Sequence, residues 1–435
     1  MIKQIIFTST LLISFGILAF SFIRVFALLR LTKPFRIKNI GARIWLMLKV
    51  AIWQSKIFRR PVLGFLHALV FWGFCFILVG SMEMMIDGVL GIEKSFSFLG
   101  IIYNIIIISG DIFAWLVLIA ICVFFVRRVF MNVKRFSGIE MKHKSHQDAN
   151  FALSLIFVLM VTLIWMNILS YAMNPSEGKL FYPVNAFFGE FFVSLNPDLL
   201  KTGFEINWWT HIVIIFIFMN VLPYSKHFHV FMSVPNVFLS RLEPLGKLPN
   251  MDNITKEVKM MLNPETAYDT PAGQPAEIER FGVKDIEDVT WKNYLDSLSC
   301  TECGRCTSSC PANITGKKLS PRKLMIDMRA RMKEKGRKLI KEGKKYDDSK
   351  SLLRDYISHE EIWACTTCNA CAQECPVNIN HPELIIFLRR YLVMEEAAAP
   401  SGLNVMFTNI ENNGAPWQFS PEDRLLWAND ISINK

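Results

Sequence analysis

Two groups of cysteines in the C-terminal half have a spacing that is typical of iron–sulfur cluster ligands. They read CTECGRCTSSCP and CTTCNACAQECP, so both follow the pattern C-x2-C-x2-C-x3-C-P. At this spacing three cysteines can bind three irons of one cubane, while the cysteine beside the proline reaches the other cluster. The sequence therefore predicts two [4Fe–4S] clusters, one held by Cys300, Cys303, Cys306 and Cys375, the other by Cys365, Cys368, Cys371 and Cys310.

Zinc and disulfide bonds are the alternatives for these cysteines. Zinc sites use pairs of the C-x2–4-C type rather than triplets followed by Cys-Pro. Disulfide bonds would need an oxidising compartment, whereas we expect this part of the chain in the cytoplasm. The other two cysteines, Cys75 and Cys122, lie within apolar runs and are expected to pack there as small apolar side chains.

Histidines at the end of an apolar run suggest a second kind of redox centre. The stretch LPYSKHFHVFMSVPN (222–236) contains His227 and His229, and His211 lies earlier in the same run. In an unbroken helix, the 18 residues from His211 to His229 make five turns, which puts both on one face about 27 Å apart. This distance nearly matches the hydrocarbon thickness of a bilayer. His227 would then face the opposite side.

A haem b with two axial histidines needs a second helix that offers an imidazole at the same depth. His67 lies in another apolar run, shortly after Arg59 and Arg60, which mark the same membrane edge as His229. We therefore predict that His67 and His229 bind one haem b. His67 and His211 should lie at opposite edges and should not share an iron. The alternative is that these histidines are interfacial or hydrogen-bonded core residues.

The segment WTHIVIIFIFMNVLPYSKHFHVFMSVP resembles the last span of the nitrate reductase gamma subunit family. That resemblance implies that His211 and His229 are haem ligands and that His67 is the first ligand on the second span. The family usually has another histidine ten residues further on, where this chain has Ile77. The resemblance therefore implies one haem, or two if His211 binds a haem with a different partner. His211 could instead line a quinone site, or do neither.

The composition indicates that these centres belong to a membrane protein. The chain has 435 residues, of which 52% are hydrophobic, and a mean hydropathy of +0.29. Its formal net charge of +10 is attributed to basic loops at the membrane and not to nucleic-acid binding. Five apolar runs are long enough to cross a bilayer, at about 5–28, 62–82, 101–126, 151–172 and 208–226.

The charges of the loops predict the orientation of these spans. Lys and Arg gather after the first, third and fifth runs, whereas acidic residues gather after the second and fourth. We expect the chain to span the cytoplasmic membrane. By the positive-inside rule, its N-terminus lies outside and its C-terminal domain lies in the cytoplasm. Residues 42–58 are expected as a helix in the interface or as a sixth, buried helix, and 181–195 as a helix on the outer face. Asp111, within the third run, is either functional or a hydrogen-bonding group that holds helices together.

The predicted fold class is an all-α membrane protein, with a five-helix transmembrane bundle and a cytoplasmic α-helical ferredoxin-type domain. The expected divisions are the membrane domain (1–230), a linker (231–285), the ferredoxin domain (286–395) and a tail that docks a partner (396–435). The 54 residues between the cysteine motifs, 311–364, have a helical pattern. In this respect the domain resembles the α-helical ferredoxins found among the subunits of heterodisulfide reductase and in succinate dehydrogenase iron–sulfur subunits.

The order of the parts is also informative. The stretches FGVKDIEDVTWKNYLDSLSCTECGRC and APWQFSPEDRLLWAND resemble fused membrane proteins that combine a gamma-subunit part with a heterodisulfide reductase-like part. In such proteins the second stretch leads into a cysteine-rich domain with consecutive cysteines, a motif that this chain lacks. The resemblance therefore implies a separate cytoplasmic partner that carries the cysteine-rich domain or a flavin, docking near Trp417 and Trp427.

Together these features predict an oxidoreductase subunit that carries electrons. Electrons would pass between the cytoplasmic partner, the two clusters, haem b and the menaquinone or other quinone pool. A second hypothesis is a quinone-reducing subunit of one specific dehydrogenase, fed by an electron-transferring flavoprotein or a hydroxyacid. A third hypothesis, of another class, is a redox sensor or a structural anchor that needs no haem.

Overall fold

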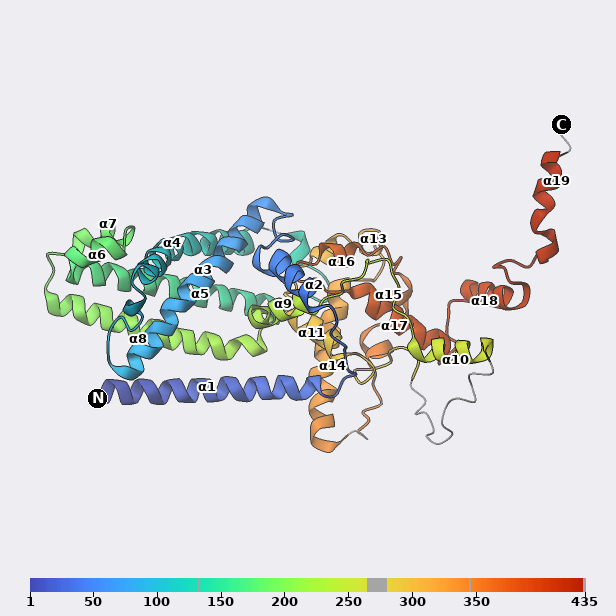
Figure 1. The fold of residues 1–435 in the computed structure, drawn as a ribbon, viewed down its shortest axis with the longest axis horizontal. Coiled ribbons are helices and arrows are strands. Elements are labelled where there is room, and N and C mark those ends of the chain that lie inside the picture. The colour runs from blue at the N-terminus through green and yellow to red at the C-terminus, as the bar shows by residue number, and fades with distance from the viewer. Residues whose placement is uncertain (132, 264–279, 344–345, 433–435) are drawn as a thin grey trace.

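The chain folds into an elongated, helical molecule with a bundle of long helices at one end and a compact domain of short helices at the other (Figure 1). The computed structural model describes residues 1–131, 133–263, 280–343 and 346–432. Within these residues there is no named β-strand. The predicted all-α fold class, with five candidate spans and a C-terminal ferredoxin-type domain, is confirmed.

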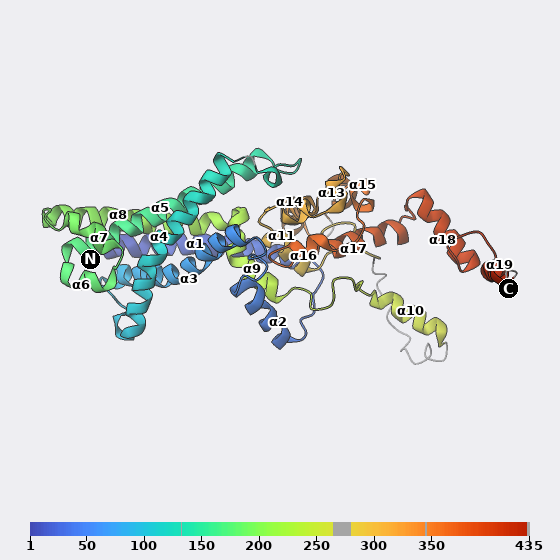
Figure 2. The same ribbon diagram turned by 90° about the horizontal axis from the view of Figure 1, so that it is seen from above.

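Five helices are long and apolar enough to cross a membrane. They begin and end close to the predicted positions, although several extend further, because polar residues continue the helices beyond their apolar cores. Of the five, α5 is the most buried and packs against both α4 and α8, while α3 packs against α4 and α1 (Figure 2). The bounds are α1 Ile2–Leu29, α3 Pro61–Leu90, α4 Ile101–Val129, α5 His143–Met173 and α8 Pro197–Val221.

The last span does not continue unbroken to His229. Helix α8 ends at Val221, and Pro223 lies in the 3₁₀ turn that follows, where it removes a backbone donor. A second 3₁₀ turn, Lys226–Phe228, precedes α9, which runs from His229 to Phe238. The prediction that His211 and His229 share one face of a continuous helix is therefore wrong.

Short helices cover both ends of the bundle. At the end that carries the N-terminus, here called the far end, lie α6 (Pro175–Phe181) and α7 (Asn185–Gly189) (Figure 1). Asp111 of α4 is fully buried there and accepts hydrogen bonds from the backbone N–H of Val184 at 2.9 Å and from the Asn185 side chain. Its observed role is thus to hold α7 against the spans.

At the opposite end, residues of the expected interfacial helix form α2 (Ile40–Met47) and a π-helical turn, Leu48–Ile52. This segment packs on α9, where the buried Arg43 side chain donates to the carbonyls of Phe238 at 3.1 Å and Ser240 at 2.9 Å. Trp45 and Trp53 on the same segment are more than half exposed. Such exposed indoles are typical of an interfacial position.

The ferredoxin domain is built from short helices around one long one. Helix α14, Pro321–Glu342, occupies much of the segment between the cysteine motifs, as the helical pattern predicted. The other helices are α11 Trp291–Ser299, α12 Arg305–Ser308, α13 Pro311–Ile314, α15 His359–Trp363, α16 Ala370–Glu374 and α17 His381–Met394, with a π-type turn at Leu352–Tyr356.

The ferredoxin core is continuous with the end of the membrane bundle. Leu28 at the end of α1, together with Phe228 and Met232 beside α9, belongs to the same apolar cluster as Leu324 and Leu388. The backbone of Lys33 is also bonded to this domain, because its N–H donates to the Val289 carbonyl at 2.8 Å. Residues 231–238, which the sequence placed in a linker, therefore belong to a packed helix.

The remaining segments lie at the edge of the ferredoxin domain. Helix α10 runs from Asp252 to Leu262, and residues 264–279 of the predicted linker (231–285) fall outside the described residues. The tail forms α18 (Ser401–Asn413) and α19 (Leu426–Ser432), which extend away from the rest of the chain (Figure 1).

Candidate functional site

The two cysteine loops have the same backbone conformation. In each loop the residue before the second cysteine has a positive φ, 58° at Glu302 and 54° at Thr367. The residue after that cysteine also has a positive φ, 72° at Gly304 and 61° at Asn369, and it begins a short helix. Repeating these left-handed positions curls both loops around their cysteines in the same way.

Backbone donors in both loops point at the cysteine sulfurs. The Thr367 N–H donates to Cys365 Sγ at 3.3 Å, and the Glu302 backbone makes the corresponding bond to Cys300. The backbones of Val377 and Ile379 also donate toward Cys375. Hydrogen bonds to sulfur are among the features that tune iron–sulfur clusters. The donor set of these loops therefore fits a cubane cluster.

The structure brings the eight thiols together in the two sets that the spacing predicts. Cys375 lies close enough to Cys300 and Cys303 for their charges to interact, and Cys306 lies in the same group. Cys310 lies instead with Cys365 and Cys371, and Cys368 completes that group. Each fourth cysteine thus reaches the other motif, although its role as a cluster ligand stays a prediction. The two groups are adjacent, since α12 packs on α16.

Burial keeps the most buried of these thiols, such as those of Cys300, Cys371 and Cys375, neutral unless a metal compensates for the charge of the thiolate. It raises the pKa of Cys300 to about 11 and that of Cys375 to about 12, and it also raises the pKa of Cys371. No three side chains of His, Cys, Asp or Glu among the described residues converge on a single ion. In a cubane each thiolate binds a different iron, so the four sulfurs need not converge on one point.

The first cysteine loop faces the membrane bundle. Arg305, between Cys303 and Cys306, is 7% exposed and donates to the backbone carbonyl of Lys56 at 2.9 Å. The Lys56 ammonium in turn donates to the carbonyls of Ala372 and Cys375, both at 3.3 Å. These bonds fix the loop that holds one group of cysteines against the segment that leads into α3.

A buried charged network supports the same loop from the other side. Glu302 forms ion pairs with Arg329 and, at 3.8 Å, with Lys226, which lies just before the His227–His229 segment. Burial opposes ionisation of Glu302, but the neighbouring cations and a hydrogen bond from Ser145 outweigh it and lower the pKa of this carboxyl. The network therefore carries fixed charge next to the first cysteine loop and connects it to α5 and the end of α8.

Among the predicted haem ligands, His67 and His229 lie near one another. His67 is close enough to His229 and to Arg305 to interact with their charges. One ring nitrogen of His67, Nδ1, is buried without a hydrogen-bond partner among the described residues. His229 Nδ1 lies 3.3 Å from the Lys226 carbonyl, which leaves Nε2 available, as in metal-binding histidines. Each of the two histidines thus offers a ring nitrogen for an axial bond, and their binding of a haem stays a prediction.

His227 and His211 have different surroundings. The His227 ring lies 5.9 Å from that of His229, and its Nδ1 is 3.1 Å from the Ser225 hydroxyl. It is therefore the neighbour of His229 and is not turned to the opposite side of a helix. His211 lies toward the far end, 1% exposed, with Nδ1 2.9 Å from the Thr162 hydroxyl. The structure does not bring His211 together with the other three.

Sequence reasoning missed the residues that connect the cysteine loops to the bundle. Buried Arg322 donates to Glu140 at 2.8 Å and to the backbone carbonyls of Arg135 at 2.7 Å and Ser137 at 2.9 Å. This clamps the 134–140 loop onto the ferredoxin domain. Gly304 offered a local signal, because a Cβ there would lie 2.5 Å from the Arg135 carbonyl oxygen. A glycine between two cysteine ligands can thus mark a close backbone approach.

Comparison with known proteins identifies the cysteine-containing part. Residues 299–379, which include all eight clustered cysteines, match the family model described as a 4Fe-4S dicluster domain. Two [4Fe–4S] clusters are therefore supported. No solved structure was found to match the chain.

Two relatives are similar to nearly the whole chain. The EtfAB:quinone oxidoreductase of Syntrophomonas wolfei is 29% identical over 91% of this chain, and the probable iron-sulfur-binding oxidoreductase FadF of Bacillus subtilis is 30% identical over 87%. This chain spans 55% of the length of each.

A shorter match covers part of the chain. One subunit of the ferredoxin/F(420)H(2)-dependent CoB-CoM heterodisulfide reductase of Methanosarcina acetivorans is 35% identical over 24% of this chain and 52% of its own. The resemblance inferred from the sequence is thereby confirmed: the chain is a membrane protein with a 4Fe–4S dicluster domain and a relative of fused, heterodisulfide reductase-like membrane iron–sulfur proteins.

Proposed function

We propose that the chain is an electron-transfer subunit that connects a cytoplasmic redox partner to the quinone pool, with menaquinone as one member of that pool. Two [4Fe–4S] clusters and one haem b would supply the one-electron carriers. The thiols of the two cysteine groups would hold the clusters, and His67 with His229 would hold the haem. The basic loops favour a cytoplasmic ferredoxin domain and an N-terminus on the outside.

The observation that carries this proposal is the position of Arg305. Its guanidinium belongs to the first cysteine loop, is bonded to the segment that begins α3, and lies near His67. The Arg305 side chain would therefore lie between a group of thiols that binds a cluster and an imidazole that binds a haem. Such closeness favours an electron wire over a sensor or a structural anchor, neither of which needs a histidine pair beside the cysteines.

We call residues 300–306 the inner cysteine loop and residues 365–371 the outer cysteine loop. The outer cysteine loop would receive electrons from the partner. Cys368 is exposed, whereas all four thiols of the first group are buried or partly buried. The tail presents Trp417, 48% exposed, and Trp427, 62% exposed, and large aromatic side chains are common anchors at interfaces.

We propose a flavoprotein of the electron-transferring type as the partner, because one relative that matches most of this chain has EtfAB and quinone in its name. This is the quinone-reducing form of the function. A cysteine-rich, heterodisulfide reductase-like protein is the second candidate, favoured by the similarity of part of this chain to a heterodisulfide reductase subunit.

The test of the electron path is optical spectroscopy of the anaerobically purified protein. We expect the low-spin b-type haem spectrum to be lost in His67→Ala and in His229→Ala. His227→Ala is the matched control, because the His227 ring neighbours that of His229, whereas only His229 of the two is close enough to His67 to interact with its charge. A haem spectrum that survives in His229→Ala but disappears in His227→Ala would show that the ligand assignment is wrong. A wild-type protein with two clusters and no haem would favour the sensor or anchor hypothesis.

The test of the partner is co-purification after gentle solubilisation. We expect a flavoprotein to be retained by the wild-type chain, and Trp417→Ala with Trp427→Ala to weaken its affinity about tenfold or more. The clusters and the haem spectrum should be unchanged in this double variant. A lone polypeptide that exchanges electrons between quinone and a soluble substrate would contradict the requirement for a partner.

A further inference from the structure

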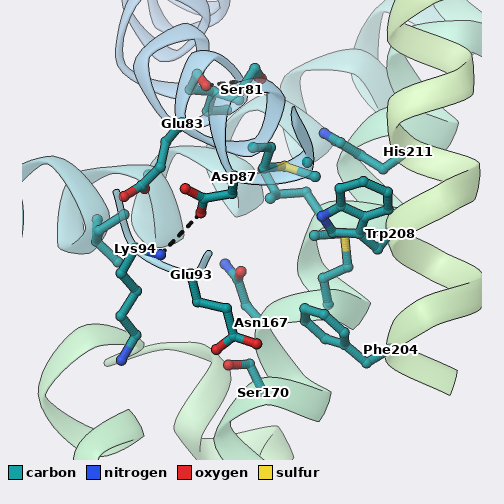
Figure 3. Close-up of a pocket in the computed structure, with 18 of the residues that line it drawn as sticks. Ser81, Glu83, Asp87, Glu93, Lys94, Asn167, Ser170, Phe204, Trp208 and His211 are labelled. Carbon is teal, nitrogen blue, oxygen red and sulfur yellow. Dashed lines mark hydrogen bonds between the residues drawn. The ribbon is translucent and has the colours of Figure 1, made fainter. Parts of the chain in front are cut away.

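A cavity of about 370 Å³ lies between the spans at the far end of the bundle. It is enclosed by α1, α3, α4, α5 and α8, and Figure 3 shows His211 and Trp208 reaching into this space from α8 toward α3. Its volume falls within the range of small-molecule sites, about 300–1,000 Å³. It is far from both cysteine groups, so neither cluster uses it.

Two glycines keep part of this cavity open. Gly80 on α3 and Gly110 on α4 both line it, and a Cβ added to either would meet no atom within 4 Å. Glycine destabilises a helix relative to alanine, and here no neighbouring atom requires it. The space beside these glycines is thus available to a ligand, with apolar side chains such as Met84, Ile106 and Leu163 forming much of the wall.

His211 offers a polar atom to this space. The Thr162 hydroxyl lies 2.9 Å from the Val158 carbonyl and 2.9 Å from His211 Nδ1. When the hydroxyl donates to the carbonyl, it accepts from Nδ1–H, and His211 Nε2 then carries a lone pair. That nitrogen can accept a hydrogen bond from a ligand hydroxyl.

Glu83 is a carboxyl at the other side of the cavity. It is 7% exposed, accepts from the Phe96 backbone N–H at 3.0 Å and is hydrogen-bonded to Tyr103. Asp87, which also lines the cavity, instead accepts from the backbone N–H groups of Lys94 at 3.0 Å and Ser95 at 3.1 Å and so holds the loop after α3. An ionisable residue within a membrane span marks a site for ions, protons or ligands.

The cavity also begins within reach of the proposed haem site. Ile77 lines it and lies ten residues after His67 on α3, which is about 15 Å along the helix axis. Ile77 and His211 both line the cavity, and an isoleucine side chain cannot supply a second axial ligand to a haem. A different ligand therefore fits the space better.

We propose that this cavity binds the headgroup of a quinone, with His211 as a hydrogen-bond partner and Glu83 as the group that exchanges protons with water at the far end. This inference rests on the proposed function and adds the location of its quinone site. Reduction to the quinol consumes two electrons and two protons. A haem held by His67 and His229 would supply the electrons one at a time, drawn from the clusters and the flavoprotein, and the protons would enter past Glu83.

The test fills the cavity without touching its polar groups. Gly80→Leu and Gly110→Leu should each place a side chain in the open space, while leaving the clusters and the haem spectrum intact. Gly16→Leu is the matched control, because Gly16 lies in span α1, has no atom within 4 Å of an added Cβ, and does not line the cavity. The probe is the fluorescent quinol analogue 2-heptyl-4-hydroxyquinoline N-oxide, titrated by fluorescence quenching on the purified holoprotein in nanodiscs.

We expect both cavity variants to bind the probe at least tenfold more weakly than Gly16→Leu, and to oxidise or reduce a soluble quinone more slowly. If the wild type binds the probe and reacts with quinone while the cavity variants behave like the control, the quinone site lies elsewhere and only this inference fails. If the wild type neither binds the probe nor reacts with quinone, the proposed function fails.

Glu83→Gln, which keeps an acceptor for Phe96, should change the pH dependence of quinone turnover and leave probe binding intact. An unchanged pH profile would remove Glu83 from the proposal.

Discussion

The two cysteine loops, 300–306 and 365–371, share a spacing, a pair of left-handed positions and a short helix, yet they face opposite surroundings. The first is covered by the bundle, with Lys56, Arg305 and Arg329 close to its thiols. The second has a partly exposed and an exposed cysteine, Cys365 and Cys368.

This difference shows that the motif specifies how a cluster is held, and the surroundings specify what the cluster can exchange electrons with. A loop that is buried against α3 can serve only a centre within the protein. A loop with an exposed cysteine can serve a protein that binds from solution. Two copies of one motif would thus place two clusters at different points along the proposed electron path.

The largest expected effect is the loss of a whole cluster when a crossing cysteine is removed. Cys375→Ser should remove the inner cluster, built on the first motif, and Cys310→Ser should remove the outer one, so that each variant retains about four of about eight irons. Iron content and EPR spectra measure this, because the two clusters should differ in spectrum. If Cys375→Ser instead removed only the cluster of its own triplet, the cysteines would not cross over.

The next largest effect should be a loss of stability when the Arg322–Glu140 clamp is broken, since this clamp holds the ferredoxin domain to the bundle. Arg322 and Glu140 form a buried ion pair, with side chains 1% and 4% exposed. Arg322→Ala leaves Glu140 buried without its cation, which typically costs about 3–5 kcal/mol. The Tm of the purified holoprotein should fall clearly.

The matched control is Lys318→Ala on the outer side. Lys318 and Glu360 also form an ion pair, but both side chains are at least 60% exposed. Water screens such pairs, so the Tm should hardly change. Equal losses of Tm in the two variants would show that the inner loop is no more firmly held than the outer surface.

A smaller effect should follow from exchanging the residues at equivalent left-handed positions. Gly304→Asn keeps a residue type that tolerates a positive φ, but its Cβ would lie 2.5 Å from the Arg135 carbonyl oxygen. Relieving such a clash costs about 1–3 kcal/mol. Asn369→Gly in the outer loop should cost less than about 1 kcal/mol, because only the Asn369 bond to the Thr367 carbonyl is lost. Thermal unfolding of both variants checks the difference, and a benign Gly304→Asn would contradict the close approach.

The smallest effect should be on the reduction potentials. Arg305→Gln removes a positive charge that stabilises the reduced inner cluster, so its potential should fall by tens of millivolts, on the order of the effect of one partly screened charge. Arg389→Gln should lower the outer potential less, because Arg389 is more accessible to water. EPR-monitored redox titration measures both. A larger shift in the Arg389 variant would mean that exposure does not separate the two loops electrostatically.

The sequence predicted what depends on local spacing. Four cysteines at fixed intervals indicate both the cluster type and the exchange of Cys310 and Cys375, because those intervals reflect the size of a cubane. The five spans were predictable for a similar reason, since each needs about 20 apolar residues in a row.

What the sequence did not predict depends on residues brought together from distant segments. The break between α8 and α9 has a local signal in Pro223, which lacks the backbone donor that an unbroken helix needs. The Arg322–Glu140 clamp joins residues 182 positions apart, and no periodicity links them. The far-end cavity is lined from five helices, so its existence depends on how those helices pack.

The apolar cluster that joins Leu28, Phe228 and Met232 to Leu324 and Leu388 has a consequence for the biogenesis of the protein. Because the ends of the spans complete the ferredoxin core, that domain cannot bury its apolar surface before the bundle has been inserted. Cluster binding stabilises only the folded core, so its free energy is shared with the membrane half through these contacts. A cell short of iron should therefore degrade the whole protein rather than accumulate an intact membrane domain without clusters.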